Sequence, residues 1–145
     1  EKKAANKETL TEKGVKLGLK SVDKETAIRN AGKLLAELGY ADESYAESMI
    51  EREKLITTYM GMGVAIPHGT THKEGVVKKS GIVVMQYREG VDFDGEKAQL
   101  IFGIAGLGDE HLDILSNICN VLEDEDVLKT LKMTKNVSYV LDKLQ

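Results

Sequence analysis

The feature that most restricts the fold is a change of hydrophobic period along the 145 residues of the chain. Apolar and polar residues alternate over residues 15–19, which is the period-two pattern of a half-buried strand. From Ala27 to Leu38 apolar residues recur at intervals of three and four, which predicts a helix that begins near Asp23 and ends at Gly39. Both periods in a chain of one-domain size predict a single α/β domain in which helices cover a small sheet.

The same patterns predict the remaining elements. Helices are expected over about 42–56, from a cap at Asp109 to Leu122, and over about 124–133 and 137–143; strands are expected over 80–87 and 100–105, with a loop or hairpin at 88–95. The helix after Asp109 has an apolar stripe, from which we expect Cys119 to be a buried, inert core residue. Residues 1–9 are polar and are expected to be a flexible N-terminus, which leaves residues 10–145 for the domain.

Composition excludes several classes of protein. One cysteine forms no intrachain disulfide and no cysteine-rich zinc module, so a reducing, cytoplasmic location is expected. The longest apolar runs are far shorter than the roughly 18 to 20 residues that span a bilayer. A formal charge of −4 without a basic tract argues against binding of nucleic acid. A small molecule or another protein is the expected partner.

The single proline of the chain, Pro67, stands directly before His68 and Gly69. Proline restricts its own φ and favours an extended Ile66, while glycine permits a sharp turn, so His68 is expected at the end of a short strand. A neutral imidazole held in this way can act as a nucleophile. From this context alone, a turn histidine without a chemical role is an equal alternative.

Two other residues are candidates for binding an anion. His111 lies in the first turn of the helix after a glycine-rich loop, where backbone N–H groups favour anions, although its position alone favours an ordinary helix histidine. The guanidinium of Arg52 suits a phosphate if its helix end faces His68, and is otherwise a solvated charge. Met60 and Met62 are either core residues or an adaptable docking surface.

Nucleotide and metal sites are both disfavoured. The glycines at 103–108 and at 61–63 lack the spacing of a dinucleotide fingerprint, and there is no Walker-type Gly-Lys-Ser/Thr. A zinc site formed by His68, His72 and His111 remains a weak alternative. Gly69 makes a helical face there doubtful, and no glutamate follows His68 as in His-Glu-x-x-His.

Residues 51–55 and 59–70, with the element Ile66-Pro67-His68-Gly69-Thr70, strongly resemble the enzyme IIA domain of the bacterial phosphoenolpyruvate-dependent sugar phosphotransferase system. The resemblance is to the mannitol/fructose class, with the mannitol branch closest, and it extends from about residue 10 to the end. Further agreement lies at residues 23–29, 86–91, 103–106 and 109–112. This family has a small mixed sheet with helices on both sides. One departure is Met62, where a polar residue, usually asparagine, is expected.

The resemblance implies a role for each candidate residue. His68 would accept a phosphoryl group from the phosphohistidine of the carrier protein HPr and pass it to a cysteine of enzyme IIB. Enzyme IIB then phosphorylates mannitol, or a related polyol or fructose, as the membrane component IIC imports it. His111 would be the second active-centre histidine and Arg52 the active-centre arginine, with no cofactor or metal.

Phosphoryl transfer to His68 requires a positioned ring nitrogen and stabilisation of the phosphate charge. We expect a backbone carbonyl to fix the tautomer of His68, and N–H groups near Gly69 or at the helix start to help hold the phosphate. The alternative within the family is a regulatory, nitrogen-type IIA module in which phosphorylation of His68 is a switch.

Overall fold

The computed structural model describes residues 9–69 and 75–145. After a 3₁₀ turn η1 (Glu12–Gly14), the strands are β1 (Val15–Lys16), β2 (Tyr59–Gly61), β3 (Val64–Ala65), β4 (Gly81–Phe93) and β5 (Glu96–Ala105). The helices are α2 (Lys24–Glu37), α3 (Tyr45–Leu55), α4 (Glu110–Leu122), α5 (Glu125–Met133) and α6 (Val137–Leu144). Apart from Thr9, the expected flexible segment 1–9 lies outside the described residues.

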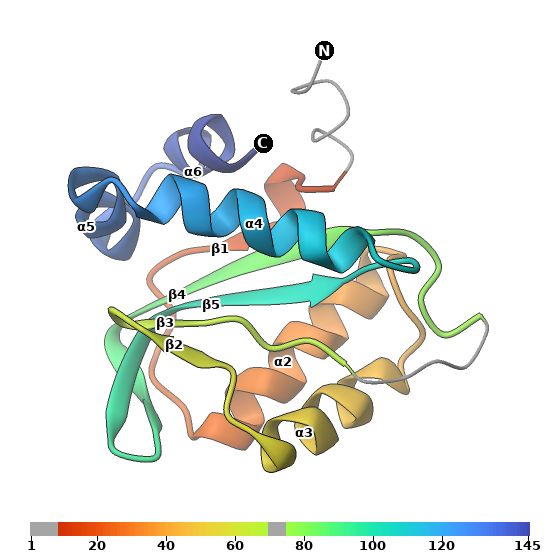
Figure 1. The fold of residues 1–145 in the computed structure, drawn as a ribbon. Helices are drawn as coiled ribbons and strands as arrows, with labels where there is room; N and C mark the ends of the chain where they lie inside the picture. The colour runs from red at the N-terminus through yellow and green to blue at the C-terminus, as the bar shows by residue number, and fades with distance from the viewer. Residues whose placement is uncertain (1–8, 70–74) are drawn as a thin grey trace.

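The described strands form one mixed sheet in the order β1-β4-β5-β3-β2. Its centre is the antiparallel β4–β5 hairpin, with β1 parallel to β4, β3 parallel to β5, and β2 antiparallel to β3 at the edge. Helices α2 and α3 cover one face, and α4, α5 and α6 lie on the other (Figure 1). The predicted α/β fold, with helices on both sides of a small sheet, is confirmed.

Strand β5 shows how the sheet separates two hydrophobic cores. Leu100, Phe102 and Ile104 are buried in the core under α4–α6, whereas Ile101 is buried in the core under α2 and α3. Because both faces are covered, the strand is a nearly continuous apolar run rather than an alternating one. Gly103 permits close packing on α2, since a Cβ there would lie 2.9 Å from the Cβ of Ala31.

The first two helices follow their sequence signals closely. The side chain of Asp23 accepts a hydrogen bond from the Thr26 N–H and caps α2, and Gly39 ends that helix with a φ of 85°. Helix α3 begins three residues later than predicted. The reason is that the Asp42 carboxylate accepts hydrogen bonds from the backbone N–H and hydroxyl of Ser44, which makes a local turn before the helix.

Two strand boundaries differ from the prediction. Strand β1 ends at Lys16 because Gly18 has a φ of 64° and gives its N–H to the side chain of Gln86. Of the loop or hairpin predicted at 88–95, the hairpin is confirmed, but β4 extends beyond its predicted end at residue 87, because the β4–β5 pairing continues to the turn at Asp94 and Gly95. These two residues have φ values of 57° and 99°, as tight hairpin turns require. The register shift between Gln86 and Val91 accounts for the turn-like sequence inside β4.

Helix α4 follows its prediction only in part. Asp109 occupies the N-cap position, as predicted, but its side chain makes no capping hydrogen bond. Cys119 is exposed, so the prediction of a buried thiol is wrong. Ile118 and Leu122 are the buried positions, and Cys119 lies about 100° further round the helix from Ile118. Helices α5 and α6 lie where predicted and are capped by the side chains of Asp124 and Asn136.

Across residues 9–69 and 75–145, no helix has the length and apolar character needed to cross a bilayer.

Candidate active site

His68 lies just after strand β3, where the chain leaves the sheet. Ile104, near the end of β5, donates its N–H to the carbonyl of Pro67 at 3.0 Å, and His68 forms an isolated parallel bridge with Ile104. Upstream, the N–H of Ile66 donates to Thr58 at 3.1 Å. The backbone is therefore held on both sides of the proline, and the predicted position of His68 at a strand end is confirmed.

The ring of His68 is oriented by its own backbone. Its Nδ1 atom lies 2.8 Å from the carbonyl oxygen of Ile66. Because a carbonyl only accepts, this contact assigns the proton to Nδ1 and leaves the lone pair on Nε2. The pKa of His68 lies below its ordinary value, mainly because the ring is partly buried. The hydrogen bond to Ile66 opposes this shift, whereas the nearby charge of Arg52 adds to it.

His111 lies directly beside His68. The two ring centroids are 6.2 Å apart and their planes differ by 25°. His111 is in the first turn of α4, and its Nδ1 is 3.3 Å from the carbonyl of Gly108. Gly106 allows the preceding loop to approach, since a Cβ there would lie 2.4 Å from the backbone nitrogen of His111.

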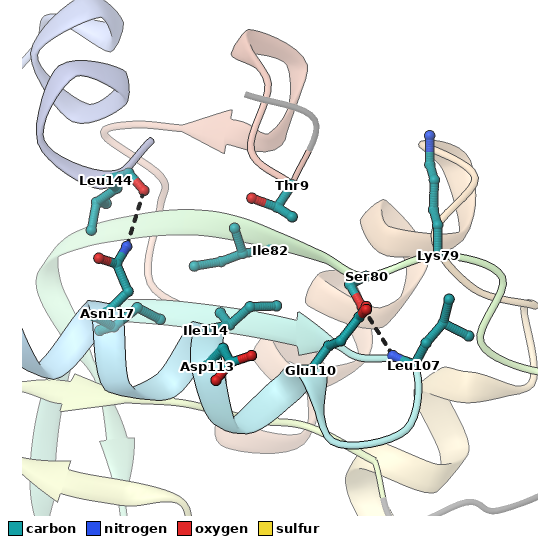
Figure 2. A pocket seen from close by; sticks show the side chains of 11 residues that line it. Thr9, Lys79, Ser80, Ile82, Leu107, Glu110, Asp113, Ile114, Asn117 and Leu144 are labelled. Carbon is teal, nitrogen blue, oxygen red and sulfur yellow. Dashed lines mark hydrogen bonds between the residues drawn. The ribbon is translucent and has the colours of Figure 1, made fainter. Parts of the chain in front are cut away.

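The loop before α4 is fixed by Ser80. The Ser80 hydroxyl accepts a hydrogen bond from the N–H of Leu107 at 3.0 Å and donates one to the carboxylate of Glu110. Figure 2 shows these three residues at one end of a cavity of about 450 Å³, whose lining includes Ile82 and Ile114. His68, Arg52 and His111 do not line this cavity, so its wall supports the loop rather than forming the site.

Arg52 reaches the site from the last turn of α3. Its Nη1 donates to the carbonyl of Ile56 at 2.6 Å, which holds the guanidinium near the end of the helix. Its positive charge lowers the pKa of His68, and the neighbouring ring of His111 acts in the same direction. The structure thus places His68 beside His111, and Arg52 near enough for its charge to affect the His68 ring.

The residue after Arg52 secures the segment that leads into β2. Glu53 is buried, and its carboxylate accepts hydrogen bonds from the N–H of Thr58 at 2.8 Å and from the hydroxyl of Thr57. Lys24 of α2 lies 3.1 Å from the same carboxylate. Glu53 lies on the buried stripe of α3. Its helical spacing in the sequence was therefore a signal that its carboxylate has a structural role.

The two methionines near the site have different environments. Met60 is partly buried against the core under α4–α6, whereas 53% of Met62 is exposed. Other exposed apolar side chains lie within four residues of Arg52 or His111 in the sequence. Leu55 and Ile56 follow Arg52, and Leu107 and Leu112 flank His111.

Local patterns in the sequence did not predict a role for Tyr45. Its buried hydroxyl accepts a hydrogen bond from the N–H of Gly69 at 2.9 Å. That N–H groups near Gly69 or at the helix start help to hold a phosphate stays a prediction. Tyr45 and Ser80 act across 24 and 27 residues of sequence, respectively, so local sequence patterns carry no signal for them.

The arrangement of possible metal ligands bears on the zinc alternative. Within the part of the chain that the structure describes, no three His, Cys, Asp or Glu side chains are grouped to hold a metal ion. The suggested set of His68, His72 and His111 is not tested by this observation, because His72 lies outside the described residues.

Known proteins resemble this chain along almost its whole length. The family described as "Phosphoenolpyruvate-dependent sugar phosphotransferase system, EIIA 2" matches residues 8–145. The mannitol-specific EIICBA component of Pasteurella multocida is 48% identical over 136 residues, which are 91% of this chain and 22% of that protein. This chain thus spans about a fifth of the length of that relative. The mannitol-specific enzyme IIA component of Enterococcus faecalis is 42% identical over 142 residues, covering 90% of this chain and 98% of that protein.

Solved structures agree with these relatives. The enzyme IIA in the Escherichia coli complex of enzyme IIAMtl and phosphorylated enzyme IIBMtl superposes with a TM-score of 0.87 at 39% identity, covering 93% of this chain and 96% of that one. The nitrogen regulatory protein IIA-Ntr of Neisseria meningitidis has a TM-score of 0.76 at 28% identity, covering 95% of this chain and 97% of that one. With the family match over residues 8–145, these similarities show that the chain belongs to the EIIA 2 family of the phosphoenolpyruvate-dependent sugar phosphotransferase system.

Proposed function

We propose that this chain is a phosphocarrier of the sugar phosphotransferase system that serves mannitol. His68 accepts a phosphoryl group from phospho-HPr and passes it to a cysteine of enzyme IIB. The observation that carries the proposal is the 2.8 Å contact of His68 Nδ1 with the Ile66 carbonyl, which leaves Nε2 as the nucleophile beside His111. The relatives named for mannitol are 42% and 48% identical, against 28% for the nitrogen regulatory protein, which favours mannitol transport over regulation.

In the accepting step, the lone pair of His68 Nε2 forms a bond to phosphorus while the P–N bond of the donor phosphohistidine breaks. The electron pair of that bond returns to the donor ring, and the proton of His68 stays on Nδ1, which donates it to the Ile66 carbonyl. Little covalent chemistry is required beyond alignment and charge stabilisation. Arg52 and His111 supply the positive charge and hydrogen-bond donors for the phosphoryl oxygens.

In the delivering step, a thiolate of enzyme IIB attacks the phosphorus, and the electron pair of the breaking P–N bond returns to Nε2 of His68. The thiolate belongs to the partner, since Cys119 is on helix α4 and not among the residues around His68. The name of the Escherichia coli complex, which pairs its enzyme IIA with phosphorylated enzyme IIB, supports this pairing. Enzyme IIC would then import mannitol as IIB phosphorylates it.

Two further expectations remain part of the proposal. Residues 10–145 form an enzyme IIA domain, whether alone or within a longer chain such as the EIICBA relatives. A cytoplasmic location follows from the need to meet HPr.

Incubation with phosphoenolpyruvate, enzyme I and HPr, with and without the IIB domain of a mannitol system, tests the proposal. We expect an acid-labile, base-stable phosphate adduct that disappears when IIB is added, as the IIB cysteine becomes phosphorylated. The His68→Ala variant should form no adduct. An unmodified wild-type protein, or an undiminished adduct in His68→Ala, contradicts the proposal. An adduct that IIB cannot discharge indicates the regulatory, nitrogen-type alternative instead.

A further inference from the structure

The hydroxyl of Tyr45 connects the residue after His68 to the end of strand β5. It accepts a hydrogen bond from the N–H of Gly69 at 2.9 Å and donates one to the carbonyl of Ile104 at 2.7 Å. Tyr45 is the first residue of α3, and only 3% of it is exposed. A buried hydroxyl with both a donor and an acceptor partner has one well-defined orientation.

This hydroxyl completes the parallel bridge between His68 and Ile104. In such a bridge, Ile104 donates its N–H to the residue before His68 and accepts from the N–H of the residue after it. The first bond is direct, from Ile104 to Pro67 at 3.0 Å. In the second, the hydroxyl of Tyr45 accepts from the N–H of Gly69 and donates to the Ile104 carbonyl. The backbone on the C-terminal side of His68 is thus held through a side chain of α3.

Tyr45 also packs tightly against Gly69. A Cβ added at Gly69 would lie 2.5 Å from Cε1 of Tyr45 and 2.7 Å from Oγ of Ser48. The side chain of Tyr45 therefore occupies the space that any larger residue at position 69 would need. The contact with Tyr45 therefore requires glycine at position 69, in addition to the role of Gly69 in the turn. Helix α3, which begins at Tyr45, also carries Arg52.

We propose that Tyr45 is a positioning residue for phosphoryl transfer, which holds the backbone after His68 so that Nε2 keeps its direction toward the incoming phosphorus. The inference rests on the proposed function of His68. A misplacement of about 1 Å in a reacting group can reduce a rate about a hundredfold. Tyr45 touches neither the nucleophilic atom nor the phosphoryl group, so it acts only through the backbone of Gly69 and Ile104.

The test compares Tyr45→Phe, which removes only the hydroxyl, with Tyr87→Phe as a matched control. Tyr87 is also a buried tyrosine, 1% exposed, and its hydroxyl bonds to Asn30 rather than to the backbone near His68. Three quantities are measured in each variant. They are the rate of phosphoryl transfer from phospho-HPr, the ¹⁵N chemical shifts of the His68 ring, and the hydrogen exchange rate of the Gly69 amide.

In Tyr45→Phe we expect at least tenfold faster exchange of the Gly69 amide, moved ring shifts of His68, and a roughly tenfold slower transfer with an unchanged KM for phospho-HPr. Tyr87→Phe should lower Tm without any of these changes. An unchanged transfer rate and unchanged His68 shifts in Tyr45→Phe would overturn the inference. So would equal rate losses in the two variants, since they would indicate a general loss of stability.

Two of these measurements test the role of Tyr45 even if the proposed function of His68 is wrong. The exchange and chemical-shift measurements need no phosphoryl donor, so they distinguish an error about Tyr45 from an error about the function of His68. If Tyr45→Phe does not fold, exchange in the wild-type protein decides. The Gly69 amide should then exchange at least tenfold more slowly than an unstructured glycine amide, and exchange at the unstructured rate contradicts the inference.

Discussion

The imidazole of His111 lies almost parallel to that of His68, with 6.2 Å between ring centroids and 25° between ring planes. The two rings come from different segments, one from the residues after β3 and the other from the start of α4. The first is tied to the carbonyl of Ile66 and the second lies near that of Gly108. Each ring thus presents its other nitrogen to the site, one as the proposed nucleophile and one as the proposed helper.

Replacing His111 should slow phosphoryl transfer without unfolding the protein. We expect His111→Ala to reduce transfer to enzyme IIB by roughly a hundredfold, the cost of removing one donor to a developing phosphoryl charge. Rapid-quench measurement of the phosphate on each protein gives the rate. Ser116→Ala, an exposed change on the same helix, is the control and should transfer at the wild-type rate. Wild-type transfer in His111→Ala would mean that His111 has only a structural role.

Arg52 should be needed for its shape as well as for its charge. Arg52→Lys keeps one positive charge but loses the planar fork of donors, so we expect transfer from phospho-HPr to fall by at least about tenfold. The same assay on Lys54→Ala provides the control, since Lys54 is an exposed neighbour that pairs with Glu51. Equal rates for Arg52→Lys and wild type would show that a point charge suffices there.

The lowered pKa of His68 predicts two pH effects. Since Nε2 stays unprotonated below the ordinary pKa of about 6.5, acceptance of the phosphoryl group should persist below pH 6.5 and fall only at more acidic pH. The second effect concerns stability. Between the folded pKa and 6.5 the unfolded chain binds more protons, so the contribution of His68 to stability falls as pH decreases.

Denaturant unfolding of wild type and His68→Gln at several pH values measures the second effect. The difference in unfolding free energy, wild type minus variant, should decrease as pH is lowered through 6.5, by at most about 1.4 kcal/mol per pH unit. An increase of that difference at acidic pH would mean that the folded protein favours the protonated ring, contrary to its burial.

Glu53 should matter for stability far more than its exposed neighbour. Glu53→Gln replaces a buried carboxylate that binds Thr57, Thr58 and Lys24, so we expect a loss of about 1–3 kcal/mol in unfolding free energy. Glu51→Gln breaks only an exposed pair with Lys54 and should change it by less than about 0.5 kcal/mol. Equal losses in urea unfolding would show that the buried network adds nothing.

Local sequence patterns predicted the elements that depend on near neighbours. The cap at Asp23 and the left-handed Gly39 define α2 at both ends, and both are visible in the sequence. The position of His68 followed from Pro67 and Gly69 on either side of it. These features depend on backbone restrictions within a few residues, so no knowledge of the rest of the fold was needed.

The wrong predictions depend on contacts between distant parts of the chain. Strand β4 continues through a glycine-containing segment because β5 pairs with it beyond a bulge. Cys119 is exposed because the stripe of α4 that faces the sheet is narrower than the apolar pattern suggests, with Ile118 and Leu122 buried and Cys119 beside them. The roles of Tyr45 and Ser80 arise from hydrogen bonds to loops far away in sequence. Family resemblance supplied Arg52 and His111 as site residues, whereas local pattern alone left both undecided.

The atom that carries the phosphoryl group tests the central claim most directly. The protein, ¹⁵N-labelled in its histidine rings, is phosphorylated with phosphoenolpyruvate, enzyme I and HPr, and its ring nitrogens are then assigned by NMR. We predict a phosphorus–nitrogen bond at Nε2 of His68, with the Nδ1 proton retained toward Ile66. A phosphoryl group on Nδ1 of His68, or on His111, would contradict the account.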